Sequence, residues 1–284
     1  WRNVEETAKR GLALSPNTGV LAEREVRPTN LAGAVRTTFE RLQSDMPPRL
    51  SLRRVLRTRC TDHSQIEEAF QIQLDGMPDA GGEMARSAGY HSSALTIALD
   101  YIKVSSACRI AEDLTSASRA VPVFNIRVST DAALHLDFLE FALNEVSQSG
   151  IGTDRLCLEF RDSARLREES RVADFARTLR SIGCLIAVGD VNPARGATSE
   201  LQIMSPHMLA LDASLWPPSE SDDRLTALHQ AISDLHHLVG EHVVLRDNRA
   251  RDKAAQLGID FVEFFDPDEM DPVALVAHMP TLQR

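Results

Sequence analysis

Polar side chains capable of acid–base chemistry follow a series of apolar runs in this sequence. They are the amide of Asn125 and the carboxylates of Glu159, Asp190, Asp212 and Asp247, each near the carboxyl end of such a run. A carboxylate can act as a general base when it comes within hydrogen-bond reach of a substrate. Active sites of α/β barrels are built from residues at the carboxyl ends of several strands. The pattern therefore predicts one site at the rim of a barrel.

The apolar runs alternate with amphipathic segments, which is typical of parallel strands joined by crossover helices. Strands are predicted over 121–129, 155–160, 184–190, 207–212, 242–247 and 260–265. Helices are predicted between most of them, over 131–149, 165–182, 224–239 and 249–257. Gly183 directly follows the second of these helices and predicts its end.

The first third of the chain adds a helix over 31–43, strands over 51–58 and 70–75, and a long helix over 93–114. About eight strands result, so we predict an α/β fold, a (β/α)8 TIM-type barrel. A doubly wound open sheet is the alternative. We expect residues 34–284 to form the barrel. Residues 1–33 show little periodicity, and we expect a linker or the tail of an upstream domain there.

Composition and charge narrow the class of protein. The 284 residues are 43% hydrophobic and 25% charged, which is ordinary for a globular chain. The net charge of −10 argues against a broad nucleic-acid surface. The arginines between 49 and 59 leave two interpretations open, a solvated strand and loop or a local binding patch. No apolar run approaches the roughly 20 residues of a membrane span.

The four cysteines are far apart in the sequence, which excludes a disulfide scaffold and a zinc finger. Cys157 and Cys184 lie inside apolar runs and are predicted to be buried thiols. We therefore expect a reducing, cytoplasmic location.

Several segments, in order and spacing, resemble the EAL domain, a bacterial family that hydrolyses cyclic di-GMP. The resemblance covers roughly residues 34–279. It is carried by ARSAGY (85–90), FNIRVS (124–129), RLCLEFRDS (155–163), SIGCLIAVGD (181–190), HMLALDASL (207–215), HVVLRDN (242–248) and LGIDFVEFF (257–265). It implies a barrel whose carboxylates and asparagine hold two divalent cations that activate water and stabilise charge on the phosphodiester.

Carried over residue by residue, the resemblance leaves an incomplete site. Asn125, Glu159 and Asp190 match metal-binding positions of the family. Five other positions are substituted: Phe70 for the signature glutamate, Gly189 for one aspartate of a pair, Ala210 for a lysine, Arg246 for a later glutamate and Glu263 for a glutamine. The phosphate-clamping arginine would be Gln73 or Leu74. Two anions are lost and one cation is added, so we predict no bound metal, no cofactor and no hydrolysis of cyclic di-GMP.

The three retained residues have structural interpretations as well. Asn125 is either a remnant ligand or a strand end that caps a loop. Glu159 and Asp190 are either remnant ligands or members of an ion-pair network with Arg246 or Arg161, and the network is favoured.

We predict a catalytically inactive EAL-like domain that acts as a regulatory or protein-interaction module in bacterial signalling. Its protein partner is not identified by the sequence, a homodimer is left open, and no nucleic acid is expected to bind. One alternative is a cyclic di-GMP receptor that binds without hydrolysis. Another is an active hydrolase on a different substrate that uses Glu159 or Asp190 as its general base, and an active cyclic di-GMP phosphodiesterase is the least favoured.

Overall fold

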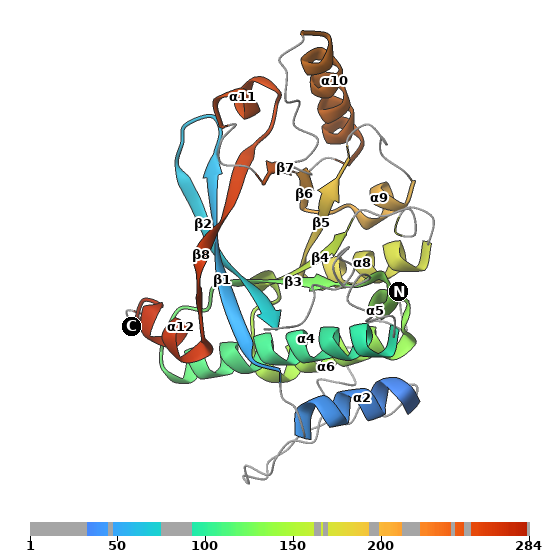
Figure 1. Cartoon of the computed structure of the whole chain (residues 1–284), viewed down its shortest axis with the longest axis vertical. Coiled ribbons are helices and arrows are strands. Elements are labelled where there is room, and N and C mark those ends of the chain that lie inside the picture. The colour runs from blue at the N-terminus through green and yellow to red at the C-terminus, as the bar shows by residue number, and fades with distance from the viewer. Residues whose placement is uncertain are drawn as a thin grey trace.

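Eight strands of this chain form a closed barrel with neighbours in the order β1 to β8 (Figure 1). The structure is a computed structural model that describes residues 33–44, 48–74, 93–161, 166, 170–192, 199–211, 222–239, 242–246 and 251–282. The strands are β1 (Leu50–Arg59), β2 (Gln65–Leu74), β3 (Val123–Val128), β4 (Leu156–Arg161), β5 (Leu185–Val191), β6 (Met208–Leu211), β7 (His242–Leu245) and β8 (Phe261–Met270). The prediction of a barrel is confirmed, and the open sheet is excluded.

The helices lie outside the barrel, and α4 runs beside α6 below strands β3 and β4 in the view of Figure 1. They are α2 (Gly33–Ser44), α4 (Ser93–Ser116), α5 (Thr130–Leu134), α6 (Leu136–Ser149), α8 (Ser170–Ser181), α9 (Ser199–Met204), α10 (Asp222–Val239), α11 (Arg251–Gln256) and α12 (Pro272–His278), with a short 3-10 turn, η1 (Thr153–Arg155). Helices α9 and α12 were not predicted. The helix predicted over 131–149 is two helices, α5 and α6, separated by the extended residue His135.

One strand departs from the predicted all-parallel arrangement. β1 pairs antiparallel with both β2 and β8, whereas every other neighbouring pair is parallel. β1 and β2 are joined by the few residues between Arg59 and Gln65, too few for a crossover helix. A connection of that length can join only antiparallel neighbours.

Two apolar layers hold the fold together. One fills the inside of the barrel and consists of Val55, Ala69, Val123, Cys157, Ala187, Met208, Ala210 and Val244. The other, much larger, lies between the outer faces of the strands and the helices and includes Phe39, Phe70, Tyr101, Phe124, Phe138 and Phe160. Residues of a strand therefore alternate between an inner and an outer environment, and both are buried.

Two local predictions are confirmed, one for the end of a helix and one for two cysteines. Helix α8 ends at Ser181, and Gly183 follows with φ of 102°, a conformation that favours glycine. Cys157 and Cys184 are buried free thiols, and burial raises the pKa of Cys184 to about 12. No helix within the described ranges is long and apolar enough to span a membrane. Residues 1–32, Asp212 and Asp247, for which predictions were also made, lie outside the described residues.

Candidate functional site

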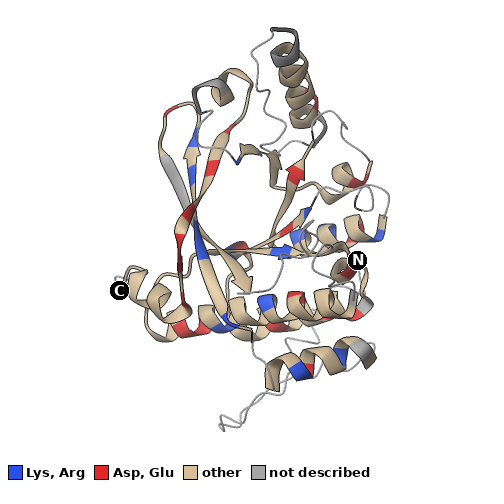
Figure 2. Cartoon of the chain, viewed as in Figure 1, with Lys and Arg blue, Asp and Glu red and all other residues tan. Residues whose placement is uncertain are grey.

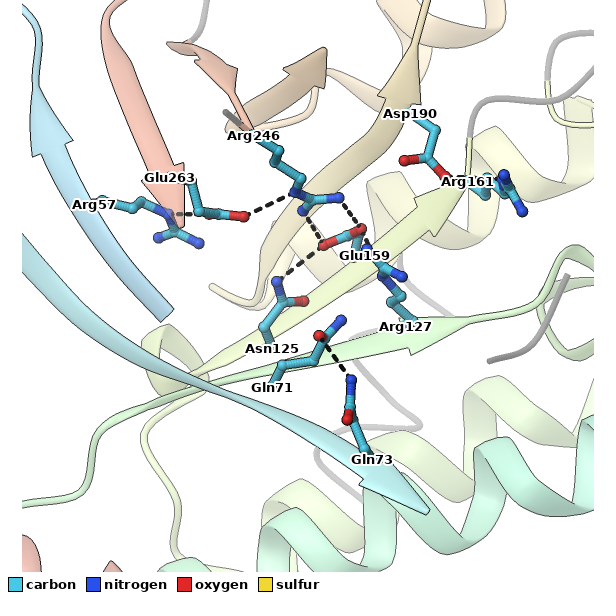
Figure 3. Close-up of polar contacts among 10 residues, drawn as sticks. All are labelled: Arg57, Gln71, Gln73, Asn125, Arg127, Glu159, Arg161, Asp190, Arg246 and Glu263. Atoms are coloured by element: carbon cyan, nitrogen blue, oxygen red, sulfur yellow. Dashed lines mark hydrogen bonds and ion pairs between the residues drawn. The ribbon is translucent and has the colours of Figure 1, made fainter. Parts of the chain in front are cut away.

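Glu159 is the centre of a polar cluster inside the barrel (Figure 3). It lies on β4, next to the strand that carries Asn125, and both side chains point inward and are buried. Asn125 Nδ2 donates a hydrogen bond of 2.9 Å to Glu159 Oε2. The structure thus brings together two of the three retained residues. The contact also shows that Asn125 binds a carboxylate rather than capping a loop.

Arg246, which directly follows β7, connects Glu159 to Glu263 on β8. Its Nη1 and Nη2 donate to the two oxygens of Glu159 at 2.8 and 2.6 Å. Its Nε donates to Glu263 Oε1 at 2.8 Å. The planar guanidinium is suited to such paired contacts, which are among the stronger hydrogen bonds in proteins.

Two further arginines complete the cluster. Arg57 Nε donates to Glu263 Oε2 at 2.7 Å, and Arg127 Nε donates to Glu159 Oε1 at 3.1 Å. We call these five residues, Arg57, Arg127, Glu159, Arg246 and Glu263, the ion network. Three arginines against two glutamates give it a charge of +1 when all five are ionised.

The electrostatics keep both carboxylates ionised. Burial alone would raise the pKa of Glu159, but Arg246 and Arg127 outweigh it and hold that pKa at about 2. Burial opposes ionisation of Glu263 in the same way, and Arg246 and Arg57 lower its pKa below the ordinary range. Burial would lower the pKa of Arg246, but Glu159 and Glu263 raise it instead. The favoured prediction of an ion-pair network is confirmed for Glu159.

Asp190 lies at the carboxyl end of β5, in contact with Arg161 rather than with the ion network (Figure 3). Arg161 Nε lies 2.9 Å from Asp190 Oδ2, and both side chains are partly exposed. Asp190 has a φ of 56°, an uncommon conformation for a residue other than glycine. The prediction that Asp190 pairs with Arg161 is confirmed.

Gly189 explains how the ion network fits into the barrel. A Cβ added at this position would overlap with Glu159 Oε1 and lie 2.9 Å from Arg246 Nη1. The Arg246–Glu159 pair thus fills the space that any side chain at residue 189 would need. The absence of a side chain at Gly189 therefore makes room for the guanidinium of Arg246 against Glu159.

The assignment of Phe70 to the site is wrong by one residue. In the β2–β3 register Phe70 pairs with Phe124, whereas Gln71 pairs with Asn125. Paired residues share a face of the sheet, so Gln71 faces the barrel interior with Asn125 and Phe70 faces the helices. Phe70 is fully buried there and makes an edge contact with His278 of α12. Gln71 thus borders the candidate site from β2, and Gln73 donates a hydrogen bond to it from the same strand.

Ala210 faces the barrel interior, within the inner apolar layer, and supplies no cation to the site. Sequence reasoning did not single out three members of the site, Arg57, Arg127 and Gln71. Arg57 lay within the arginine-rich segment whose role was left open. Only the strand register shows that each of these residues shares a face with an acidic or amide group on a neighbouring strand.

Three arginines of β1 form ion pairs across the β1–β8 ladder. Figure 2 shows basic positions of β1 beside acidic positions of β8. The shortest N–O separations are 2.9 Å for Arg53–Glu269, 3.8 Å for Arg54–Asp266 and 2.7 Å for Arg57–Glu263. The segment is a strand, as one interpretation predicted, but Arg57 is buried rather than solvated, and three of the arginines join two strands.

The donors around Glu159 decide whether the described residues suit a divalent cation. Such ions need oxygen ligands with accessible lone pairs, and a two-metal site needs bridging carboxylates. Each oxygen of Glu159 already accepts two hydrogen bonds, from Arg127 and Arg246 at Oε1 and from Asn125 and Arg246 at Oε2. Within the described part of the chain, no group of three or more His, Cys, Asp or Glu residues is arranged to hold a metal. The described residues therefore do not fit a metal centre.

Residues 83–263 match the family model described as the EAL domain. No curated protein matches the chain.

Three solved structures are similar in fold. The EAL enzyme Bd1971, bound to cAMP and cyclic di-GMP, is 14% identical, with a TM-score of 0.62 over 86% of this chain and 68% of that one. The FimX EAL domain from Pseudomonas aeruginosa, bound to cyclic di-GMP, is 11% identical, with a TM-score of 0.59 over 82% and 94%. Klebsiella pneumoniae BlrP1, in a complex with manganese and cyclic di-GMP, is 14% identical, with a TM-score of 0.58 over 76% and 54%. Because the family model spans more than half of the sequence and the barrel agrees with these structures, this chain belongs to the EAL domain family.

Proposed function

We propose that this protein is a catalytically inactive EAL domain that serves as a regulatory or protein-interaction module in bacterial cyclic di-GMP signalling. One observation carries the proposal: the guanidinium of Arg246 binds Glu159 and Glu263 together, inside the barrel. A fixed cation thus occupies both oxygens of Glu159, the carboxylate that matches a metal-binding position of the family.

The charge of the ion network supports this proposal. A divalent cation at Glu159 would lie against the guanidinium of Arg246, whose Nη2 is 2.6 Å from Glu159 Oε2. At an effective dielectric constant near 20, two like unit charges 4 Å apart repel by about 4 kcal/mol. The repulsion energy doubles for a divalent ion. Binding the ion would also require breaking hydrogen bonds that Glu159 accepts.

General-base catalysis without a metal is also unfavourable here. An effective base has a pKa near the working pH, whereas the pKa of Glu159 is about 2 and its oxygens are occupied by donors. General-base action contributes only about 10²–10⁴-fold to a rate. Metal ions in hydrolases supply much more, because they lower the pKa of bound water from 15.7 to about 7.

A turnover assay tests the proposal. Purified protein is incubated with cyclic di-GMP and excess Mg²⁺ or Mn²⁺, and linear product is measured by chromatography. We expect no product above the background of a matched preparation of Glu159→Ala protein. Product that forms with the wild type and is lost in Glu159→Ala would show an active site and overturn the proposal.

Binding of cyclic di-GMP without hydrolysis is the second candidate function. It is favoured by Arg127 and Arg161, whose side chains are 28% and 47% exposed and could face an anionic ligand. Both are also engaged with carboxylates, which lowers their attraction for a phosphate. Calorimetric titration of cyclic di-GMP in metal-free buffer separates the two candidates. We expect no heat of binding, whereas binding that disappears in Arg161→Ala would establish a receptor.

A further inference from the structure

Beside the ion network, strands β1, β2 and β3 present four polar residues to the barrel interior. We call Ser51, Arg53, Gln71 and Asn125 the polar wall. Arg53 is opposite Gln71 in the β1–β2 register, and Gln71 is opposite Asn125 in the β2–β3 register. Ser51 shares the face of Arg53, two residues along β1. The wall is therefore continuous across three strands.

Each member of the polar wall has a buried polar atom with no hydrogen-bond partner among the described residues. These atoms are Ser51 Oγ, Arg53 Nε, Gln71 Nε2 and Asn125 Oδ1. Gln71 and Asn125 are 1% and 0% exposed. Folded proteins satisfy nearly all such buried groups with protein atoms or ordered water. A run of four on adjacent strands indicates a bound molecule.

The orientations of two carboxamides define what that molecule must do. Asn125 Nδ2 is held by Glu159, so its Oδ1 faces away as an acceptor. Gln71 Oε1 accepts from Gln73 Nε2 at 3.3 Å, so its Nε2 remains as a donor. Figure 3 shows the two carboxamides beside one another, on neighbouring strands. A molecule between them must accept from Gln71 and donate to Asn125.

Charge restricts the molecule further. An anion at Asn125 would be repelled by the carboxylate of Glu159, one hydrogen bond away. A cation would face the donors of Arg53 and Gln71. Arg53 is itself neutralised by Glu269 at 2.9 Å. The requirements are met by a small neutral molecule that both donates and accepts.

We infer that the polar wall binds an ordered water molecule that accepts a hydrogen bond from Gln71 Nε2 and donates one to Asn125 Oδ1. Buried waters commonly make about three hydrogen bonds to otherwise unsatisfied groups. This water keeps Asn125 turned so that its amide donates to Glu159, and it engages the amide oxygen that a metal would use. The inference extends the proposed function, because it describes what replaces a metal shell beside the ion network.

Two measurements on the intact protein test the inference. The first is a high-resolution crystal structure from crystals grown in Mn²⁺ and handled without organic cryoprotectant. The second is an NMR experiment that detects transfer between water and the side-chain amide protons of Gln71. We expect one water peak within hydrogen-bond distance of Gln71 Nε2 and Asn125 Oδ1, and a water cross-peak to the Gln71 amide.

The variant Gln71→Met removes the donor at similar volume and should lose the water peak. Gln202→Met, at an exposed position of α9, is the matched control and should keep it. A direct Gln71–Asn125 hydrogen bond with no water between them overturns the inference and leaves the proposed function standing. A strong anomalous manganese peak at Glu159 or Asn125 overturns the proposed function as well. If Gln71→Met does not fold, the wild-type measurements alone decide.

Discussion

Replacing Arg246 with alanine should cost this protein a large part of its stability, because it leaves two buried carboxylates with fewer partners. Glu159 would lose two of its four hydrogen bonds, and Glu263 would lose the bond at Oε1 while keeping the one from Arg57 at Oε2. Removing one partner of a buried ion pair typically costs about 3–5 kcal/mol. The remaining contacts from Arg127 and Arg57 place our expectation near the lower end, at about 3 kcal/mol. That is a substantial fraction of the roughly 5–15 kcal/mol that stabilises a typical domain.

Urea unfolding followed by circular dichroism measures this loss as a shift in the midpoint at an unchanged slope. The matched control is Arg177→Ala, because Arg177 is bonded to Asp174 at 2.6 Å while both side chains are exposed. Exposed pairs contribute about 0–1 kcal/mol, so the control should change little. Arg246→Lys should recover only part of the loss, because an ammonium group cannot bind Glu159 through two parallel donors.

Free guanidinium provides a second readout. If the loss comes from the missing cation, about 20 mM guanidinium chloride should partly restore the stability of Arg246→Ala relative to 20 mM sodium chloride. At that concentration its denaturing effect is only about 0.1 kcal/mol. An Arg246→Ala protein as stable as Arg177→Ala, with no response to guanidinium, would refute the central role that we give to the ion network.

Three further predictions follow from the same geometry. The folded-state pKa of Glu159 is about 2, below its ordinary value of 4.5, so its ionisation stabilises the fold fully above about pH 4.5. About 3 kcal/mol of unfolding free energy should be lost as the pH falls from 4.5 toward 2. Urea unfolding at each pH measures this loss, and Glu159→Gln should flatten the profile over that range. Gly189→Ala should destabilise the protein by about 1–3 kcal/mol, because the added Cβ overlaps with Glu159 and Arg246. Gly33→Ala in α2 is the control and should not destabilise it, because a Cβ there meets nothing within 4 Å. Equal urea midpoints for the two variants would contradict this explanation. A protein partner should present a basic surface to this chain of net charge −10; its association rate, measured by stopped flow, should fall as salt increases, and a rate independent of salt would indicate an apolar interface instead.

The sequence was sufficient to predict the barrel, because strands and helices alternate clearly from residue 121 onward. It was not sufficient for the direction of β1. The eleven residues between the predicted strands 51–58 and 70–75 left no room for a helix, and this was the available signal for an antiparallel pair. The carboxyl end of β8 was also missed, because Asp266, Asp268 and Glu269 look like a loop in the sequence. The structure places Arg54 against Asp266 and Arg53 against Glu269.

The error at β2 has a physical cause that applies to other barrels. The run FQIQLD alternates apolar and polar residues, and a one-residue change of register exchanges its two faces. In most sheets with one buried face, the apolar side chains point toward the hydrophobic core and the polar ones toward solvent. Here Phe70 and Ile72 face the helices, whereas Gln71 borders the polar part of the barrel interior. A strand whose inner positions are polar and whose outer positions are apolar is thus a sign of a polar site inside a barrel.

The ion network and a metal centre are two solutions to the same electrostatic problem. Buried carboxylates such as Glu159 and Glu263 are unfavourable unless positive charge lies against them. A metal ion supplies that charge and also presents water as a nucleophile, but it can dissociate, so the site depends on its supply. Arg246 supplies the charge from within the chain and presents no water. A domain built in this way should keep one conformation at its barrel mouth whether or not divalent cations are present, which is what the proposed role in recognition by a partner requires.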